Sequence, residues 1–312
     1  MEVKLWQYDE FPDFNDVPEG VEVLRTTGDE PGVMYMNDVE YANIGGVPLR
    51  LQLLLPYSRN KGFDPFAGEQ AEKRPCYVFV QGSAWMKQHI YGNVPALSRL
   101  ARRGYVCAIV EYRHSDIAYF PAQVNDARNA VRFLKKNAAK YGIDPDRMIL
   151  AGDSSGGHTA VWGGIHHNDE SGQNLFPGIS GEVAGIVDYY GCTTMMIPDS
   201  NPITVNHCLP DSPEGKVMGG RNLLAHPELA KALSAECNID EKTKIAPVLI
   251  FHGTKDRIVN CKCSVILYER LKQTGHDATL YLLRGADHGG AEFWTDEIIG
   301  IVDRFCRRCF LK

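Results

Sequence analysis

The chain lacks the features that nucleic-acid-binding and membrane proteins show. Its 312 residues include 33 Lys and Arg against 39 Asp and Glu, the net charge is −6, and no segment forms a basic stripe. No apolar run approaches the roughly 18 residues of a membrane span. The acidic, aromatic start, MEVKLWQYDEFPDF, has neither the basic nor the apolar region of a secretory signal. We therefore expect a cytoplasmic protein without a nucleic-acid or membrane partner.

The chain also lacks the cysteine pattern of a disulfide framework. Its nine cysteines are odd in number and scattered, and several lie in apolar runs, as Cys107 does in YVCAIV. Reduced cytosolic proteins use cysteine in this way, as a small core residue. A four-thiolate zinc site from C-x-C at 261–263 and C-x-x-C at 306–309 is the alternative, but C-x-C is not the usual spacing of such sites. We therefore expect no metal and no cofactor.

No internal repeat or low-complexity tract is present, and short apolar runs alternate with amphipathic segments. The expected strands are 34–42, 47–56, 75–82, 105–112, 147–152, 181–191, 245–253 and 278–285. The expected helices are 94–104, 121–142, 155–167, 263–275 and about 291–310. We expect the first two strands, joined by the turn NIGG, to form an antiparallel hairpin. The alternation that follows predicts an α/β fold, with a mostly parallel central sheet and helices on both faces.

Two regions fall outside this alternation. Residues 1–33 predict an irregular N-terminal arm in front of a single domain, 34–312. The arm holds four aromatic residues, Trp6, Tyr8, Phe11 and Phe14. We expect them to hold the arm to its own domain, and a dimer contact or a part of the substrate cleft is the alternative. The proline-rich stretch 192–244, with one helix near 226–235, predicts a small insertion over the carboxyl ends of the strands. Homo-oligomer formation stays open.

The stretch GDSSGGH fits the frame G-x-S-x-G, with Ser154 at its centre. The apolar run before it predicts a strand and the run after it a helix, and a sharp turn between them would expose the serine hydroxyl. Gly152 and Gly156 remove side chains that would meet the neighbouring strand or helix. Ser155 does not fit the frame, because Asp153 stands two residues before it. We predict Ser154 as a nucleophile, with a structural turn as the alternative.

A serine nucleophile needs a base and an orienting acid, which in this kind of fold follow it at strand ends. His288, in RGADHGG, follows the strand ATLYLL, and Asp256, in FHGTKDRIV, follows the strand VLIFHG. We predict that His288 removes the proton of Ser154 and that Asp256 fixes the imidazole tautomer. Asp188 is a second candidate for the acid. The structural alternative for Asp256 is an ion pair with Lys255 or Arg257, or the capping of a turn.

The loop VQGSAW, after the strand YVFV, is placed to bind an oxyanion. Two backbone N–H groups in such a site stabilise a tetrahedral intermediate, and one donor contributes about 3 kcal/mol. We predict one donor from Ser83 or Ala84 and the other from Ser155. Trp85, the next residue, contacts the substrate's acyl group or packs in the core.

These motifs together resemble a known family. VQGSAW is similar to the HGGGW loop, and GDSSGG to the elbow, of the hormone-sensitive-lipase-like and carbohydrate-esterase branch of the α/β-hydrolases. DSPEGKVMGG resembles the insertion of the acetyl-xylan and feruloyl esterase-like group, in which a small helix follows. The resemblance covers about 45–310 and implies the α/β-hydrolase fold. Gln81, Ser83 and Ala84 depart from it, because they replace a histidine and two glycines.

The expected function is that of a serine carboxylic-ester hydrolase that works through an acyl-enzyme. The resemblance implies acetyl or hydroxycinnamoyl esters of carbohydrate, on a small molecule or an oligosaccharide. An arylformamidase and a short-chain lipid esterase use the same triad and fold, so both stay open. A non-catalytic ligand-binding protein on a hydrolase scaffold is the alternative of a different class, because the oxyanion loop is altered.

Overall fold

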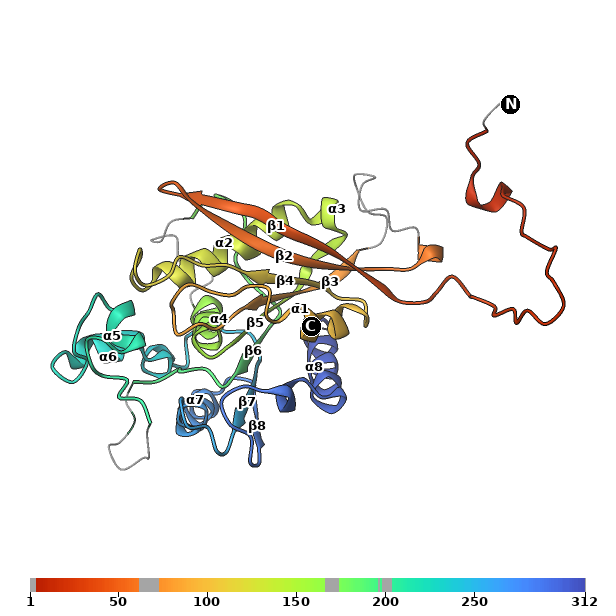
Figure 1. The fold of residues 1–312 in the computed structure, drawn as a ribbon. Helices are drawn as coiled ribbons and strands as arrows, with labels where there is room; N and C mark the ends of the chain where they lie inside the picture. The colour runs from red at the N-terminus through yellow and green to blue at the C-terminus, as the bar shows by residue number, and fades with distance from the viewer. Residues whose placement is uncertain (1–3, 62–72, 166–173, 196, 198–203, 312) are drawn as a thin grey trace.

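The computed structural model describes residues 4–61, 73–165, 174–195, 197 and 204–311. Within these residues eight strands form one sheet in the order β1-β2-β4-β3-β5-β6-β7-β8 (Figure 1). The strands are β1 (Gly32–Ile44), β2 (Val47–Tyr57), β3 (Arg74–Val80), β4 (Val106–Val110), β5 (Ile143–Asp153), β6 (Gly185–Tyr189), β7 (Val248–Gly253) and β8 (Ala278–Leu283). The β1–β2 and β2–β4 pairs are antiparallel and the other pairs are parallel, which confirms the predicted α/β fold.

Helices cover both faces of this sheet. The described helices are α1 (Val94–Ala101), α2 (Ala122–Lys136), α3 (Ala138–Tyr141), α4 (Ser155–Ile165), α5 (Pro213–Val217), α6 (Pro227–Leu233), α7 (Lys262–Gln273) and α8 (Asp296–Cys309). One face packs against α1 and α8, and the other against α2, α4 and α7. The last two residues of the helix predicted at 155–167 lie outside the described residues. Of the described helices, none has both the length and the apolar character needed to cross a membrane.

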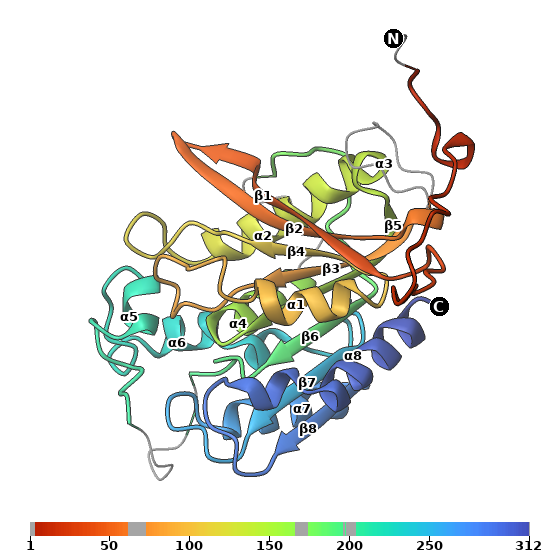
Figure 2. The ribbon, with the colours of Figure 1, turned by 45° about the vertical axis from the view of Figure 1, so that its right-hand side comes forward.

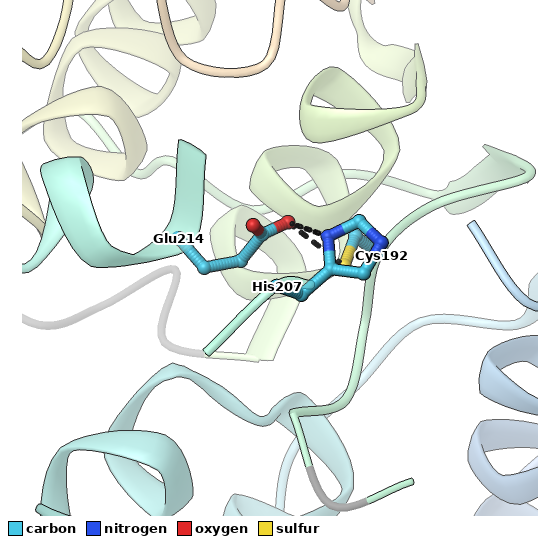
Figure 3. A group of neighbouring side chains, drawn as sticks. All are labelled: Cys192, His207 and Glu214. Atoms are coloured by element: carbon cyan, nitrogen blue, oxygen red, sulfur yellow. Dashed lines mark hydrogen bonds and ion pairs between the residues drawn. The ribbon is translucent and has the colours of Figure 1, made fainter. Parts of the chain in front are cut away.

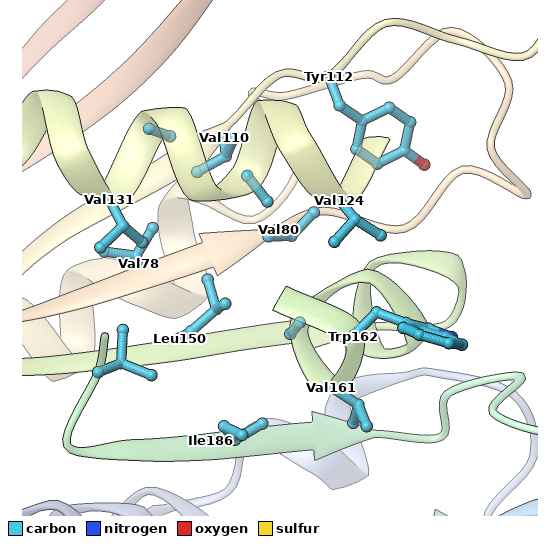
Figure 4. Close-up of a cluster of buried hydrophobic side chains, with 14 of the residues drawn as sticks. Val78, Val80, Val110, Tyr112, Val124, Val131, Leu150, Val161, Trp162 and Ile186 are labelled. Carbon is cyan, nitrogen blue, oxygen red and sulfur yellow. The ribbon is translucent and has the colours of Figure 1, made fainter. Parts of the chain in front are cut away.

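The central strands are apolar along their whole length because both of their sides are covered. Val78 and Val80 of β3 and Leu150 of β5 pack in the cluster beneath α2 and α4 (Figure 4). Tyr77 and Phe79, which alternate with these valines, pack in the cluster beneath α1 and α8. Full burial of one such side chain stabilises the fold by about 2 kcal/mol. The two clusters fix the sheet from both sides and so fix the loops at its carboxyl edge.

The long helix predicted at 121–142 is interrupted by Asn137. The side-chain amide of Asn137 donates a hydrogen bond of 2.8 Å to the carbonyl of Phe133, so it satisfies one of the carbonyls that a helix end leaves free. A separate short helix, α3, follows and ends at Gly142, whose φ of 63° is left-handed. The predicted stop at Gly142 is therefore confirmed, but the helix before it is two helices.

Two further helices differ from the expectation. The closing helix begins later than expected, as α8, because the Thr295 hydroxyl caps it by accepting the N–H of Ile298 at 3.3 Å. The short α5 was not expected from helical periodicity, although the resemblance implied a small helix there. It begins after Ser212, whose hydroxyl accepts the N–H of Gly215 at 3.0 Å.

The N-terminal arm extends away from the sheet (Figures 1 and 2). Its four aromatic side chains are 48–73% exposed, and Trp6 and Phe11 contact each other with ring centroids 5.8 Å apart. Of the four, Tyr8 does contact the domain, because the Arg59 guanidinium carbon lies 4.8 Å from the centroid of its ring. The prediction that these residues hold the arm to its own domain is therefore confirmed for Tyr8, whereas the exposure of the other three does not support it. The arm is held further along the chain, where Asn60 donates hydrogen bonds to the carbonyls of Thr27 and Gly28.

The described part of the insertion, 192–195, 197 and 204–244, contains α5 and α6. Both helices lie beyond the carboxyl ends of the central strands (Figure 2). The carbonyl of Leu233, at the end of α6, accepts the Trp162 indole N–H at 3.1 Å and lies 2.8 Å from His158 Nε2. These contacts attach the insertion to α4, and so to the same edge of the sheet as GDSSGGH.

Candidate active site

Ser154 occupies a sharp turn between β5 and α4. Its φ of 54° is left-handed, which is uncommon for a residue other than glycine, and its N–H donates to the carbonyl of Tyr189 at 2.9 Å. A Cβ added to Gly152 would lie 2.2 Å from the Gly156 carbonyl oxygen, and one added to Gly156 would lie 2.0 Å from that of Val80. Both glycines are therefore required by close packing of backbone around the turn.

The structure brings the three predicted catalytic residues into one hydrogen-bonded chain. His288, in the loop after β8, has its Nε2 2.9 Å from the hydroxyl oxygen of Ser154. Its Nδ1 lies 2.7 Å from Oδ2 of Asp256, in the loop after β7. This arrangement orients the imidazole so that an unprotonated Nε2 faces the serine hydroxyl.

Asp256 is held as a carboxylate by several donors. Its Oδ1 accepts the N–H groups of Ile258 at 2.9 Å and Val259 at 2.8 Å. Its Oδ2 lies 3.1 Å from His252 Nε2 as well as beside His288. Burial alone would raise the pKa of Asp256, but the hydrogen bonds from the two histidines outweigh it and hold the pKa well below its usual range.

His252 is a buried structural neighbour of the site, as its position at the end of a strand before the acid loop predicts. It is fully buried, and its Nδ1 lies 2.7 Å from the hydroxyl of Ser264 in α7. It lies near the end of β7, four residues before Asp256. The second candidate acid, Asp188, makes no contact with His288. It accepts the N–H of Gly191 at 3.0 Å, and burial raises its pKa to about 7.

The oxyanion loop offers fewer free donors than the sequence suggested. The N–H of Ser83 donates to the hydroxyl oxygen of Ser155 at 2.9 Å, and that of Gly82 donates to Asp153 Oδ1 at 2.7 Å. Among the described residues, the backbone N–H groups of Ala84 and Ser155 have no acceptor. Ala84 has a left-handed φ of 54° and lines the cavity at Ser154.

Three hydroxyl groups connect the oxyanion loop, VQGSAW, to the sharp turn at Ser154. The hydroxyl of Tyr112 lies 2.9 Å from that of Ser83 and 3.2 Å from that of Ser155. The Ser83 hydroxyl also donates to the carbonyl of Met86 at 2.6 Å. Burial raises the pKa of Tyr112 to about 12, so its hydroxyl keeps its proton at neutral pH. We refer to Ser83, Tyr112 and Ser155 as the hydroxyl cluster.

A cavity of about 650 Å³ opens at the serine. Its lining includes Gly82, Ala84, Ser154, Tyr190, Ile258, His288 and Trp294. Trp85 is not part of the lining: it is 1% exposed and its ring lies 5.1 Å from that of His158. Of the two roles expected for Trp85, the structure therefore shows core packing and not contact with the substrate's acyl group.

Tyr190 is a residue of the site that sequence reasoning missed. Its ring packs against His288, with centroids 4.9 Å apart, and against Phe293, with centroids 4.5 Å apart. Its hydroxyl donates to Asp153 Oδ2 at 3.4 Å. Its left-handed φ of 44° directs the chain away from β6 at the cavity. Tyr190 thus holds the imidazole from one side.

The four-thiolate zinc alternative is wrong. Cys263 packs in the cluster beneath α2, α4 and α7, whereas Cys306 and Cys309 pack beneath α1 and α8. The sheet separates the two groups, so the four thiols cannot share one ion.

Comparisons of the sequence with known proteins find one family model and relatives that are named esterases. A family model described as BD-FAE matches residues 66–271. Esterase LipC of Mycobacterium tuberculosis is 31% identical over 220 residues, which cover 69% of this chain and 53% of LipC. Isoprenylcysteine alpha-carbonyl methylesterase ICME of Arabidopsis thaliana is 26% identical over 279 residues, which cover 81% of this chain and 59% of ICME. The chain thus spans about half the length of these curated relatives.

Solved structures share the fold over nearly the whole chain. A truncated carbohydrate esterase from gut microbiota has a TM-score of 0.74 at 23% identity, covering 91% of this chain and 98% of its own. Thermogutta terrifontis esterase 2, phosphoramylated by tabun, has a TM-score of 0.68 at 22% identity, covering 91% and 97%. These likenesses establish the α/β-hydrolase fold.

Proposed function

This chain belongs to the BD-FAE family of α/β-hydrolases, and from that premise we propose that it is a serine carboxylic-ester hydrolase. One observation carries the proposal: two hydrogen bonds of 2.7 and 2.9 Å link Asp256, His288 and Ser154 in the order that nucleophilic catalysis needs. The open cavity beside the serine gives an ester access to it.

In the first half of the reaction, His288 Nε2 takes the proton of Ser154 as the serine oxygen bonds to the ester carbonyl carbon. The negative charge moves to the carbonyl oxygen, where the free N–H groups of Ala84 and Ser155 stabilise it. The tetrahedral intermediate then expels the alcohol, which takes its proton from His288. The product is an acyl-enzyme on Ser154.

In the second half, water enters and His288 acts as a base again. It takes a proton from the water as the water oxygen bonds to the acyl carbon, and it returns that proton to Ser154 when the carboxylic acid leaves. Asp256, which stays ionised, stabilises the imidazolium in both halves. Tyr190 packs on the imidazole and limits its rotation.

For the substrate we propose acetyl or hydroxycinnamoyl esters of carbohydrate. The cavity has the size of a small-molecule site, and Tyr190 and Trp294 give it aromatic walls on which a sugar ring or an aromatic acyl group would stack. The carbohydrate esterase of gut microbiota that shares the fold supports the same substrate class. A cytoplasmic location, which stays a prediction, would suit short oligosaccharides.

The first experiment measures hydrolysis of 4-nitrophenyl acetate by the wild type and by Ser154→Ala. We expect the variant to lose at least about 10⁴-fold in kcat. Equal rates would contradict the catalytic role of Ser154 and favour a binding protein. A covalent phosphonate adduct, located by mass spectrometry of peptides, gives independent evidence for the nucleophile.

The second experiment compares substrates at equal enzyme concentration. The panel contains acetylated xylooligosaccharide, methyl ferulate, N-formylkynurenine and a butyrate ester. We expect the highest kcat/KM with one of the first two. Hydrolysis of N-formylkynurenine alone would make the chain an arylformamidase, and a clear preference for butyrate would make it a lipid esterase.

A further inference from the structure

A second group of reactive side chains lies in the insertion, outside the active site. Cys192 follows β6, His207 lies in the segment before α5, and Glu214 lies on α5. Figure 3 shows the three side chains directed toward one another. The Cys192 sulfur, a His207 ring nitrogen and a Glu214 carboxylate oxygen all lie within 4.8 Å of one another.

The histidine presents a lone pair to this group. Its Nε2 lies 2.7 Å from the carbonyl oxygen of Ile258, a contact that requires the proton to be on Nε2. The neutral ring then has no proton on Nδ1, which lies 2.8 Å from Glu214 Oε1. The two atoms are close but do not meet hydrogen-bond geometry. The buried Nδ1 has no hydrogen-bond partner among the described residues. Two acceptors thus face each other.

The carboxylate is buried and incompletely bonded. Glu214 is 2% exposed, and its Oε2 has no hydrogen-bond partner in the described structure. Its Oε1 accepts a weak contact from the Cys192 thiol, at 3.4 Å, and lies 2.8 Å from His207 Nδ1. A carboxylate with one oxygen unbonded is costly to bury, so this arrangement favours a positive charge among the three side chains.

We propose that Cys192, His207 and Glu214 bind one Zn²⁺ ion. Thiolate, imidazole and carboxylate are the ligands that zinc takes, at distances of about 2.0 to 2.3 Å. In a tetrahedral site such ligand atoms lie about 3.3 to 3.6 Å apart. The distances from Glu214 Oε1 to His207 Nδ1, 2.8 Å, and to the Cys192 sulfur, 3.4 Å, therefore need to widen by about half an ångström or less. The bond of His207 to the Ile258 carbonyl is the outer contact that zinc-bound histidines usually make.

A zinc ion here would join the insertion to the active-site wall. Ile258, which His207 contacts, lines the cavity and follows the Asp256 loop. The buried thiol of Cys263, on α7, contacts that of Cys192 and places a fourth metal-binding atom near the three side chains. The role is structural: the ion would fix three parts of the chain without touching the substrate.

The test uses the full chain after treatment with a chelator, titrated with Zn²⁺ and, separately, with Co²⁺. We expect one equivalent of Zn²⁺ to bind, and Co²⁺ to give the near-ultraviolet thiolate-to-metal absorption. Cys192→Ser and Glu214→Gln should each lose this band or weaken binding at least tenfold. Cys237→Ser, which changes an exposed cysteine outside the group, is the matched control and should bind as the wild type does.

If a variant fails to fold, metal binding by the wild type still tests the proposal. A folded wild type that binds no Zn²⁺ would leave a His207–Glu214 ion pair and overturn the proposal. Co²⁺ binding without a thiolate band would do the same, because Cys192 would not be a ligand. A melting temperature that rises with Zn²⁺ in the wild type and in Cys237→Ser, but not in Cys192→Ser, supports the site independently of esterase activity.

Discussion

The backbone N–H of Ser83 donates a hydrogen bond of 2.9 Å to the hydroxyl of Ser155, so the second serine of GDSSGG holds the oxyanion loop. Removing that hydroxyl leaves the Ser83 N–H without its acceptor and frees the loop that carries Ala84. We expect Ser155→Ala to lower kcat about fivefold with little change in KM, since a hydrogen bond contributes about 1 kcal/mol and about 1.4 kcal/mol is tenfold in rate. Steady-state kinetics with 4-nitrophenyl acetate measure the effect.

The matched variant for this prediction is Tyr112→Phe. It removes another hydroxyl of the hydroxyl cluster but keeps the acceptor of the Ser83 N–H. A smaller loss of kcat than in Ser155→Ala is expected. Wild-type kinetics in Ser155→Ala would show that the loop does not depend on the hydrogen bond.

The acid that serves His288 can be identified by comparing two buried carboxylates. Asp256→Asn keeps the shape of the side chain but disturbs the tautomer of His288, and we expect kcat to fall about 10⁴-fold. Asp188→Asn is the control, because Asp188 bonds to Gly191 rather than to His288. Its kcat should stay within about threefold of the wild type. If Asp188→Asn lost as much activity as Asp256→Asn, the assignment of the acid would be wrong.

The order of the predicted triad could be inferred from the sequence because each residue follows an apolar strand, and parallel strands bring their carboxyl ends to one edge. The direction of single N–H groups could not be inferred. The N–H of Ser83 turns to Ser155 and that of Gly82 to Asp153, and both depend on contacts between segments about 70 residues apart. The contact of His252 with Asp256 could not be inferred for the same reason.

Aromatic residues were the least predictable part. Trp85 is buried against His158, while Tyr190 and Trp294 line the cavity. The sequence around each of the three residues shows only the pattern of an apolar strand or a turn. Which side of a loop faces a cavity depends on the backbone angles, such as the left-handed φ values of Trp85 and Tyr190. The aromatic residues of the arm likewise show no pattern that separates burial from exposure.

Asp188 makes the stability of the fold depend on pH. Burial raises its pKa to about 7 in the folded chain, above its value of 3.8 in the absence of burial. Between about pH 4 and pH 7 the folded state therefore holds a proton that the unfolded state releases, so stability falls as pH rises. The contribution amounts to at most about 4 kcal/mol. Asp256 has a lowered pKa in the folded chain, so its contribution to stability falls as pH decreases below about pH 4. That range lies below the one in which Asp188 acts.

Urea unfolding of the wild type and of Asp188→Asn at pH 5 and pH 8 measures this effect. The asparagine does not titrate, so the free energy of unfolding of the wild type should fall more between the two pH values than that of the variant. A difference of 1 kcal/mol or more is expected. The same pH dependence in both proteins would show that Asp188 is ionised in the folded chain at pH 5.

Gly156 is required by packing rather than by flexibility. Its added Cβ would lie 2.0 Å from the carbonyl oxygen of Val80, a backbone atom of the central strand that cannot move without moving the sheet. We expect Gly156→Ala to lower the free energy of unfolding by about 3 kcal/mol or more. Gly300, on α8, is the matched control, since an added Cβ would meet only Arg304 Nη1 at 3.5 Å and Arg103 Nη1 at 4.0 Å. There the substitution by alanine should stabilise the chain by about 1 kcal/mol, because alanine favours a helix. Urea unfolding of both variants tests the contrast, and equal effects at the two positions would mean that the elbow can accommodate a side chain.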